Sequence, residues 1–342
     1  MKRVIKNTIS VIVAVALFIA VGIGLRYLLG DDSKTSSRIV FHELYTMDDN
    51  IDTVFLGSSH VYRSIDPRVT DGYLQENTFD LATSGQRIDG SFAILKEACK
   101  YHDIKHVYLE MYNHIIWDRA QFSERDEMTS TYEVSDYMRF SVDRISLILN
   151  SSAPKYYSNA FIVARRSWEK IFDPGYISQL YELKHSEAYQ NYEMRLDKSK
   201  NYYETKGFWP SQKIMGDGPF WMKLTNGNVY ALENMTSDSD WKKTMLKIID
   251  FCEEKGIELT LFTAPEPDYE IFGKKNYQEF TDTMQELAAE HGLEFYDFNL
   301  VRHEYFDTGD RSLYMDENHL NDKGAAIFSD VFGKFFAGKI SQ

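Results

Sequence analysis

Two short segments far apart in the chain hold a serine, a histidine and an aspartate that could together carry out acyl transfer. Ser59 lies in VFLGSSHVYR at residues 54–63, where an apolar run breaks at a glycine. Asp316 and His319 lie in DENHLNDKGA at residues 316–325. An aspartate can hold an imidazole in the tautomer whose other nitrogen deprotonates a serine. If folding joins the two segments, they supply a nucleophile, a base and an orienting acid.

Each of these residues also has a common structural explanation. A serine that follows a strand and a glycine often caps the start of a helix. A histidine in a polar loop is usually only solvated. The order Asp316, His319 and Asn321 just before an apolar helix favours chemistry over simple solvation.

The elements that must position these residues alternate between strand and helix. Apolar runs of strand type occur at residues 52–56, 78–81, 106–110, 257–262 and 293–297. Helical patterns occur at residues 91–101, 243–254, 277–291 and 323–336. This alternation predicts an α/β fold with a parallel sheet covered on both faces. Functional residues gather beyond the carboxyl ends of such strands, and Ser59 lies three residues past Leu56.

The alternation stops at about residues 117–240, a segment rich in tyrosine and tryptophan. Helical patterns within it occur at residues 137–149 and 159–172. We predict a mostly helical insertion that covers one face of the core. Its segment KGFWP at residues 206–210 is either a substrate loop or ordinary aromatic packing.

The N-terminal residues predict a membrane anchor. Residues 9–25 form an apolar run whose helix would rise about 26 Å, close to the hydrocarbon thickness of about 30 Å. Lys2, Arg3 and Lys6 precede this run, which predicts a cytoplasmic N-terminus and a single pass through the cell membrane. A cleaved signal peptide is the alternative.

We therefore divide the chain into three parts. Residues 1–29 are the cytoplasmic N-terminus and transmembrane anchor, residues 30–38 are a polar tether, and residues 39–342 form an extracytoplasmic domain that contains the insertion. With 43% hydrophobic residues, a chain of this length can bury a large core. The net charge of −14 argues against nucleic-acid binding, which needs a basic surface.

Metal and cofactor sites are not expected. Cys99 and Cys252 fit no metal framework and no dense disulfide scaffold, so we interpret them as small buried residues; a single bridge between them stays open. His60 and His114 could be imagined as ligands beside Asp316, but no pair of histidines has metal-binding spacing. A serine mechanism needs no metal, and the sequence predicts neither a metal nor a cofactor.

The two segments resemble the first and last blocks of the SGNH (GDSL-type) hydrolase superfamily, named for a Ser, a Gly, an Asn and a His in four blocks. GSS at residues 57–59 resembles the nucleophile block, which implies Ser59 as nucleophile; Ser58 stands where the usual aspartate would be. Asp316 and His319 match the fourth block. The resemblance implies a flavodoxin-like three-layer sandwich.

The second and third blocks supply donors for the oxyanion hole in this superfamily. TSGQ at residues 83–86 resembles the second block, which implies that the Gly85 N–H serves beside that of Ser59. EMYN at residues 110–113 follows a predicted strand and makes Asn113 the candidate of the third block. It lacks the Gly-x-Asn-Asp form of that block, and a simple turn asparagine is an equal alternative.

A membrane anchor joined to such a domain resembles the DltD and AlgJ/AlgX-like group. This resemblance implies an extracytoplasmic serine O-acyltransferase or carboxylic ester hydrolase that uses an acyl-enzyme. The implied substrates are acetyl or D-alanyl esters of cell-envelope polysaccharide or teichoic acid, and the implied partner is a membrane-bound O-acyltransferase. The alternative is a non-catalytic scaffold that binds an envelope polymer or such a membrane partner.

Overall fold

The centre of the protein is a five-stranded parallel sheet with the strand order β2-β1-β3-β4-β5. The computed structural model describes residues 2–32, 35–113, 116, 129–194, 200–216, 240–274, 276–300 and 304–340. The strands are β1 (Thr53–Leu56), β2 (Thr78–Asp80), β3 (His106–Glu110), β4 (Glu258–Thr263) and β5 (Glu294–Asp297). Each lies within one residue of its predicted bounds, so the predicted parallel α/β sheet is confirmed.

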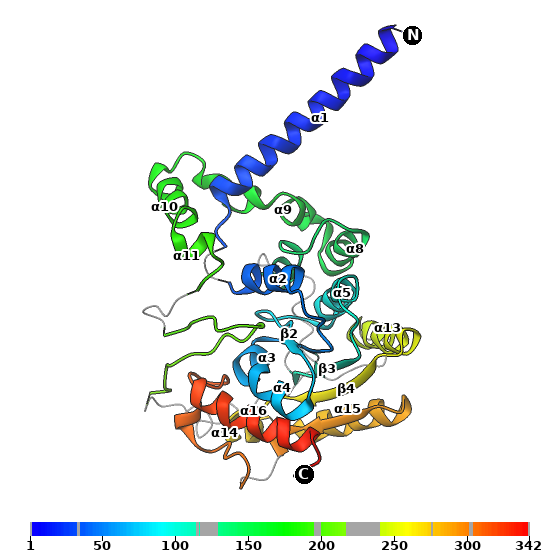
Figure 1. Cartoon of the computed structure of the whole chain (residues 1–342), viewed down its shortest axis with the longest axis vertical. Coiled ribbons are helices and arrows are strands. Elements are labelled where there is room, and N and C mark those ends of the chain that lie inside the picture. The colour runs from blue at the N-terminus through cyan, green and yellow to red at the C-terminus, as the bar shows by residue number, and fades with distance from the viewer. Residues whose placement is uncertain are drawn as a thin grey trace.

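Helices cover both faces of this sheet (Figure 1). One face carries α5 (Ile88–Ala98), α13 (Asp240–Lys255) and α15 (Tyr277–Glu290), and the other carries α3 (Ser59–Ser64), α4 (Pro67–Leu74) and α16 (Asp322–Phe336). Alternate strand residues feed the two cores, as the period of two along a strand requires. Val54, Leu56 and Leu109 are buried against the first set of helices, and Phe55 and Tyr108 against the second.

Phe332 of α16 joins three strands on the second face. Its ring centroid lies 5.6 Å from that of Phe55, 5.1 Å from Tyr108 and 5.6 Å from Phe262, each in an edge-on arrangement. Edge-to-face pairs of this kind are favoured by the ring quadrupoles. This packing fixes α16, whose start follows the segment with Asp316, against the strand that leads to Ser59.

Several helices, α3 and α4 among them, lie outside the elements predicted from the sequence. α2 (Ser37–Thr46) buries Val40, Phe41 and Leu44 in the first core. α4 begins with an aspartate cap followed by proline, a start signal that sequence reasoning could have used. Because α4 packs on α16, it also supports the segment before α16, which holds Asp316 and His319.

Within the segment at residues 117–240, the described residues 129–190 are mostly helical, whereas residues 200–216 form turns and loops whose strand-like pairing is limited to isolated bridges. The helices are α7 (Thr129–Ser135), α8 (Val142–Ser151), η2 (Pro154–Tyr156), α9 (Tyr157–Phe161), η3 (Val163–Lys170), α10 (Pro174–Lys184) and α11 (Glu187–Gln190). The helix predicted at residues 137–149 begins later, because Ser141 caps α8. The helix predicted at residues 159–172 is broken at Ile162, which has non-helical backbone angles.

The segment at residues 206–210 packs against the core. Phe208 and Trp209 are buried, and the backbone N–H of Trp209 donates to the Tyr62 carbonyl at 3.0 Å. Gly207 has a φ of +87° and presses on the backbone of Asp80, so a side chain there has no room. These contacts support the packing interpretation of KGFWP over a substrate loop.

The N-terminal helix α1 (Lys2–Leu29) projects from the body of the protein (Figure 1). Within residues 3–29 an 18-residue window reaches a mean hydropathy of 2.7, and by length and composition the helix could cross a membrane. Its last turn packs against η3 and α10. Cys99, which caps the end of α5, and Cys252 of α13 are both free thiols, so the disulfide left open by the sequence is not formed.

Candidate active site

Ser59 lies at the turn between β1 and α3. The turn needs a glycine at position 57, because a Cβ there would lie 2.5 Å from the Val61 Cγ2 and 2.5 Å from the Glu110 Cβ. Ser58 caps α3, since its Oγ accepts the N–H of His60 at 3.3 Å. The capping role that we considered for Ser59 therefore belongs to its neighbour, and the Ser59 side chain is available for other contacts.

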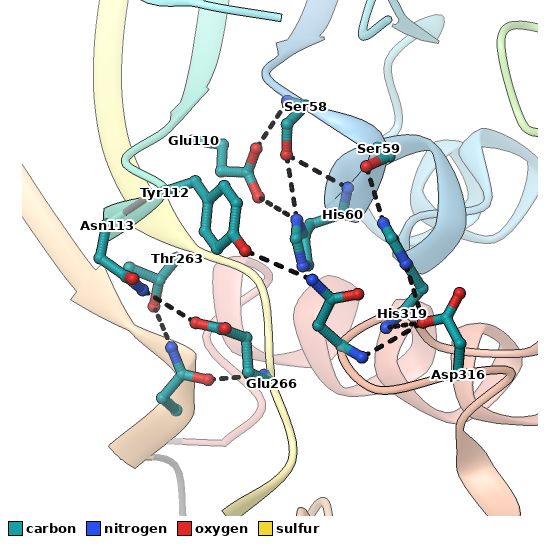
Figure 2. A network of polar contacts seen from close by, with 12 residues as sticks. Ser58, Ser59, His60, Glu110, Tyr112, Asn113, Thr263, Glu266, Asp316 and His319 are labelled. Atoms are coloured by element: carbon teal, nitrogen blue, oxygen red, sulfur yellow. Dashed lines mark hydrogen bonds and ion pairs between the residues drawn. The ribbon is translucent and has the colours of Figure 1, made fainter. Parts of the chain in front are cut away.

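The structure brings Ser59, His319 and Asp316 into one hydrogen-bonded series (Figure 2). The Ser59 Oγ lies 2.7 Å from the His319 Nε2, and the His319 Nδ1 lies 2.9 Å from the Asp316 Oδ1. All three side chains are only partly buried, so a small substrate can reach them. The distances fit an imidazole that is protonated on Nδ1 and accepts the serine proton at Nε2.

The charge on Asp316 is secured by its surroundings. Partial burial opposes ionisation, but hydrogen bonds from the His319 ring and from the N–H groups of Asn318 and His319 outweigh it. The pKa of Asp316 is therefore held well below its usual range. The carboxylate stays ionised at neutral pH, and its charge can stabilise an imidazolium on His319.

The segment that carries Asp316 and His319 is held in place by the start of α16. Asn321 caps that helix, with its Oδ1 accepting the Gly324 N–H at 3.0 Å and its Nδ2 donating to the Ser312 carbonyl at 2.8 Å. The Met315 N–H donates to the His319 carbonyl at 2.9 Å, which closes the loop on itself. The asparagine that sequence reasoning noted after the histidine thus serves to position the loop.

A layer of buried polar side chains contacts both the turn that carries Ser59 and the ring of His319. The Glu110 Oε2 accepts the Ser58 N–H at 2.6 Å, and the Ser58 Oγ lies 3.1 Å from the His60 Nδ1. The His60 ring stacks on the His319 ring with centroids 4.7 Å apart and planes 21° apart. Sequence reasoning missed this layer; the available signal was a glutamate that ends a strand beside the Gly-Ser-Ser turn.

Glu110 changes its protonation state near neutral pH. Burial raises its pKa to about 7, against the opposing effect of its hydrogen bonds from Ser58. The same carboxylate touches the turn that presents Ser59, and its Oε1 lies 4.0 Å from the His60 Nδ1. The charge of the Glu110 carboxyl, next to the turn that presents Ser59, therefore depends on pH within the physiological range.

The raised pKa of Glu110 should make the free energy of unfolding depend on pH. Because the folded protein binds the Glu110 proton more tightly than the unfolded chain, the contribution of Glu110 to stability falls as the pH rises from about 4.5 to about 7 and then levels off. We expect wild type to lose about 3 kcal/mol relative to Glu110→Gln across that window. Chemical denaturation of both proteins at several pH values measures this difference, and a pH-independent difference contradicts the assignment.

Gly85 lies beside the serine turn. The Thr83 N–H donates to the Gly57 carbonyl at 3.3 Å, and the Ser84 Oγ lies 2.9 Å from the Tyr62 hydroxyl of α3. Gly85 is exposed with a φ of +59°, a conformation that favours glycine. Neither its N–H nor that of Ser59 donates to another residue in the part of the chain that the structure describes. Both are therefore available to an oxyanion.

Asn113 is not brought to the serine. Its Nδ2 donates to the Glu266 Oε1 at 2.9 Å, and Figure 2 shows the side chain directed toward Glu266 and away from Ser59. Glu266 in turn forms a buried ion pair with Lys274, with 2.8 Å between the Nζ and Oε2. The side chain therefore has a structural partner, and its role in an oxyanion hole stays a prediction.

The site follows the strand order of the sheet. Chain connections leave β1 toward β2 on one side and then cross to β3 on the other, so the carboxyl ends of β1 and β3 meet at the switch point. Ligands of open α/β sheets bind at this crevice, and Ser59 and Glu110 lie there. The sequence correctly predicted that Ser59 lies beyond the carboxyl end of its strand, but the strand order was not predicted.

Within the described part of the chain, no three His, Cys, Asp or Glu side chains are grouped in a way that could hold a metal ion. His60, one of the imagined ligands, is instead packed between the rings of Tyr112 and His319. His114 lies outside the described residues.

In comparisons with known proteins, the chain matches no protein-family model and no curated protein.

Proposed function

We propose that this protein is a membrane-anchored serine enzyme that transfers acyl groups from esters. The observation that carries the proposal is the series from the Ser59 Oγ through the His319 ring to the Asp316 carboxylate, with distances of 2.7 Å and 2.9 Å. Ser59 and His319 are 260 positions apart in the chain, so no local motif forces these two residues together. A nucleophile, a base and an orienting acid in this order are the set that acyl transfer requires.

The reaction begins when the His319 Nε2 takes the proton of the Ser59 hydroxyl. The Ser59 Oγ then attacks the ester carbonyl, and the N–H groups of Ser59 and Gly85 stabilise the negative charge on the carbonyl oxygen. His319 gives its proton to the departing alcohol as the carbon–oxygen bond breaks. The acyl group remains on Ser59 as an ester.

A second alcohol completes the cycle. Its hydroxyl gives a proton to His319 and attacks the acyl carbonyl, and the Ser59 hydroxyl is then restored. If the second alcohol is a polymer hydroxyl, the protein is an acyltransferase; if water takes its place, it is an esterase. The same residues serve both outcomes, so acceptor binding and water exclusion decide between them.

The finer proposal follows the resemblance to SGNH hydrolases of the DltD and AlgJ/AlgX-like group. It assigns the acetyl or D-alanyl ester of an envelope polysaccharide or teichoic acid as substrate and a membrane-bound O-acyltransferase as partner. The orientation proposed here has a cytoplasmic N-terminus and an extracytoplasmic domain, supported by the basic residues before the apolar run of α1. The acyl group would then be passed to the polymer on the outer side of the membrane.

A non-catalytic scaffold is the second candidate. One observation favours it: Asn113, a donor expected from the resemblance, is bound to Glu266 instead of facing the serine. On this alternative the domain holds an envelope polymer or a membrane partner and the site is vestigial.

Hydrolysis of a chromogenic acetyl ester separates the two candidates. The full chain in mild detergent should cleave the ester, and Ser59→Ala should lower kcat by on the order of 10⁴-fold because the nucleophile is lost. Ser58→Ala tests the neighbouring serine, whose hydroxyl is buried, and it should retain far more activity. Equal trace rates for wild type and Ser59→Ala would support the scaffold.

A further inference from the structure

The last turn of α1 is bonded to the helical insertion. The Lys184 Nζ of α10 donates to the carbonyls of Tyr27 and Gly30, at 2.7 Å each, although this lysine is only 3% exposed. The Tyr176 hydroxyl donates to the Leu29 carbonyl at 3.0 Å. These groups satisfy carbonyls that the end of a helix leaves without partners. α1 is therefore fixed to the insertion at this point, and the two cannot swing freely.

The insertion consequently lies close to the end of the apolar run. That run ends at Leu25, and the four residues to Leu29 rise only about 6 Å along a helix. The Arg26 guanidinium donates to the Asp136 carbonyl at 2.7 Å, so the contact with the body begins immediately after the run. If α1 crosses a membrane, η3 and α10 lie within about one helical turn of its surface.

The same part of the insertion exposes large apolar side chains. The members of this group, with their exposed fractions, are Phe161 (44%), Ile162 (48%), Trp168 (56%), Phe172 (93%) and Tyr181 (53%). Among the described residues outside α1, thirteen large apolar side chains are exposed, and these five fall within 21 positions of the chain. Clusters of this kind mark interaction surfaces, whereas single exposed apolar residues need no explanation.

The composition and position of this group fit a lipid surface. Four of the five are aromatic, and two of these, Trp168 and Tyr181, are the types enriched where a membrane meets water, because each carries both an apolar ring and a polar group. Arg165 is exposed between them and can contact lipid phosphates. Figure 1 shows α9 and α10 gathered at the base of α1.

We propose that residues 161–181 form a membrane-contact surface that rests on the bilayer in which α1 is anchored, with Trp168 and Phe172 inserted at its interface. The inference rests on α1 spanning the membrane and is independent of acyl transfer. It makes the anchor and the insertion one unit, which holds the sheet and the Ser59 site at a fixed height and orientation above the lipid. A long-tethered domain would sample all orientations.

Depth-dependent fluorescence quenching tests this surface in the full chain. The protein is reconstituted in nanodiscs of phosphatidylcholine and phosphatidylglycerol, and an environment-sensitive fluorophore is attached at Phe172→Cys. Phe272→Cys is the matched control, because Phe272 is a similarly exposed phenylalanine (76%) on α14 (Asp268–Phe272), remote from α1 in Figure 1. Labelling is selective, since Cys252 is buried and burial raises the pKa of Cys99 to about 11.

Lipids that carry a nitroxide near the headgroup should quench the probe at position 172 at least about twofold and leave the probe at position 272 unchanged. A probe at Val15→Cys, quenched by a nitroxide deep in the acyl chains, shows separately that α1 spans the bilayer. Tyr181→Cys provides a second site on the surface in case the change at Phe172 disturbs folding. If α1 is quenched while positions 172 and 181 behave like position 272, the surface faces water or a protein partner and the proposal is overturned.

Discussion

Replacing His319 with alanine is expected to lower kcat for ester cleavage by on the order of 10⁴-fold or more. The His319 Nε2 lies 2.7 Å from the Ser59 Oγ, and no other base in the described residues is hydrogen-bonded to that hydroxyl. Without the imidazole, Ser59 keeps its proton and attacks poorly. Initial rates with a chromogenic ester, measured over a range of concentrations, give kcat and KM separately.

Two further variants make this prediction specific. The double variant Ser59→Ala with His319→Ala should be no less active than either single variant, because residues of one catalytic unit do not act additively. His291→Ala is the matched control, since His291 follows α15 at the amino end of β5, the opposite edge of the sheet from the site. Losses that multiply in the double variant, or an equal loss in His291→Ala, would contradict the assignment.

Lys274→Met should lower the free energy of unfolding by about 3–5 kcal/mol. The Lys274 Nζ lies 3.0 Å and 2.8 Å from the two carboxylate oxygens of Glu266, and both side chains are almost fully buried. Removing the lysine leaves a buried carboxylate without its cation, and the cost of that desolvated charge is large. Chemical denaturation of the full chain in mild detergent measures the loss.

The control for this prediction is an exposed ion pair of similar geometry. Lys334 and Asp330 lie 2.7 Å apart on α16 with side chains 42% and 41% exposed, so Lys334→Met should change stability by less than about 0.5 kcal/mol. Adding Glu266→Gln to Lys274→Met should restore part of the loss, because the stranded charge is removed. Equal effects of the two lysine changes would show that burial does not decide the energy of the pair.

The sheet could be predicted because each strand is marked by its own local pattern. Residues 106–110, for example, form a short apolar run between polar segments, and a fully buried parallel strand needs little else. Helix bounds were less certain where caps decide them. The start of α8 depends on whether the Ser141 side chain accepts the Arg144 N–H, which competes with a continuing helix and is not visible in the apolar pattern.

The series of Ser59, His319 and Asp316 could be expected from its motifs, whereas the contacts of Asn113 and Glu110 could not. Asn113 is directed by Glu266, 153 positions away, and that contact depends on how β3 and β4 pair. The stacking of His60 on His319 likewise arises only when the two ends of the chain meet. Such long-range partners are set by packing, and a single sequence does not show them.

Covalent labelling of Ser59 tests the central claim most directly. The full chain is treated with a serine-directed fluorophosphonate, and the adduct is measured by intact mass and then located by peptide mapping. The account predicts one adduct on Ser59, absent in Ser59→Ala and formed far more slowly in His319→Ala, because the base activates the nucleophile. An unlabelled wild type, or an adduct on another residue that persists in Ser59→Ala, would contradict it.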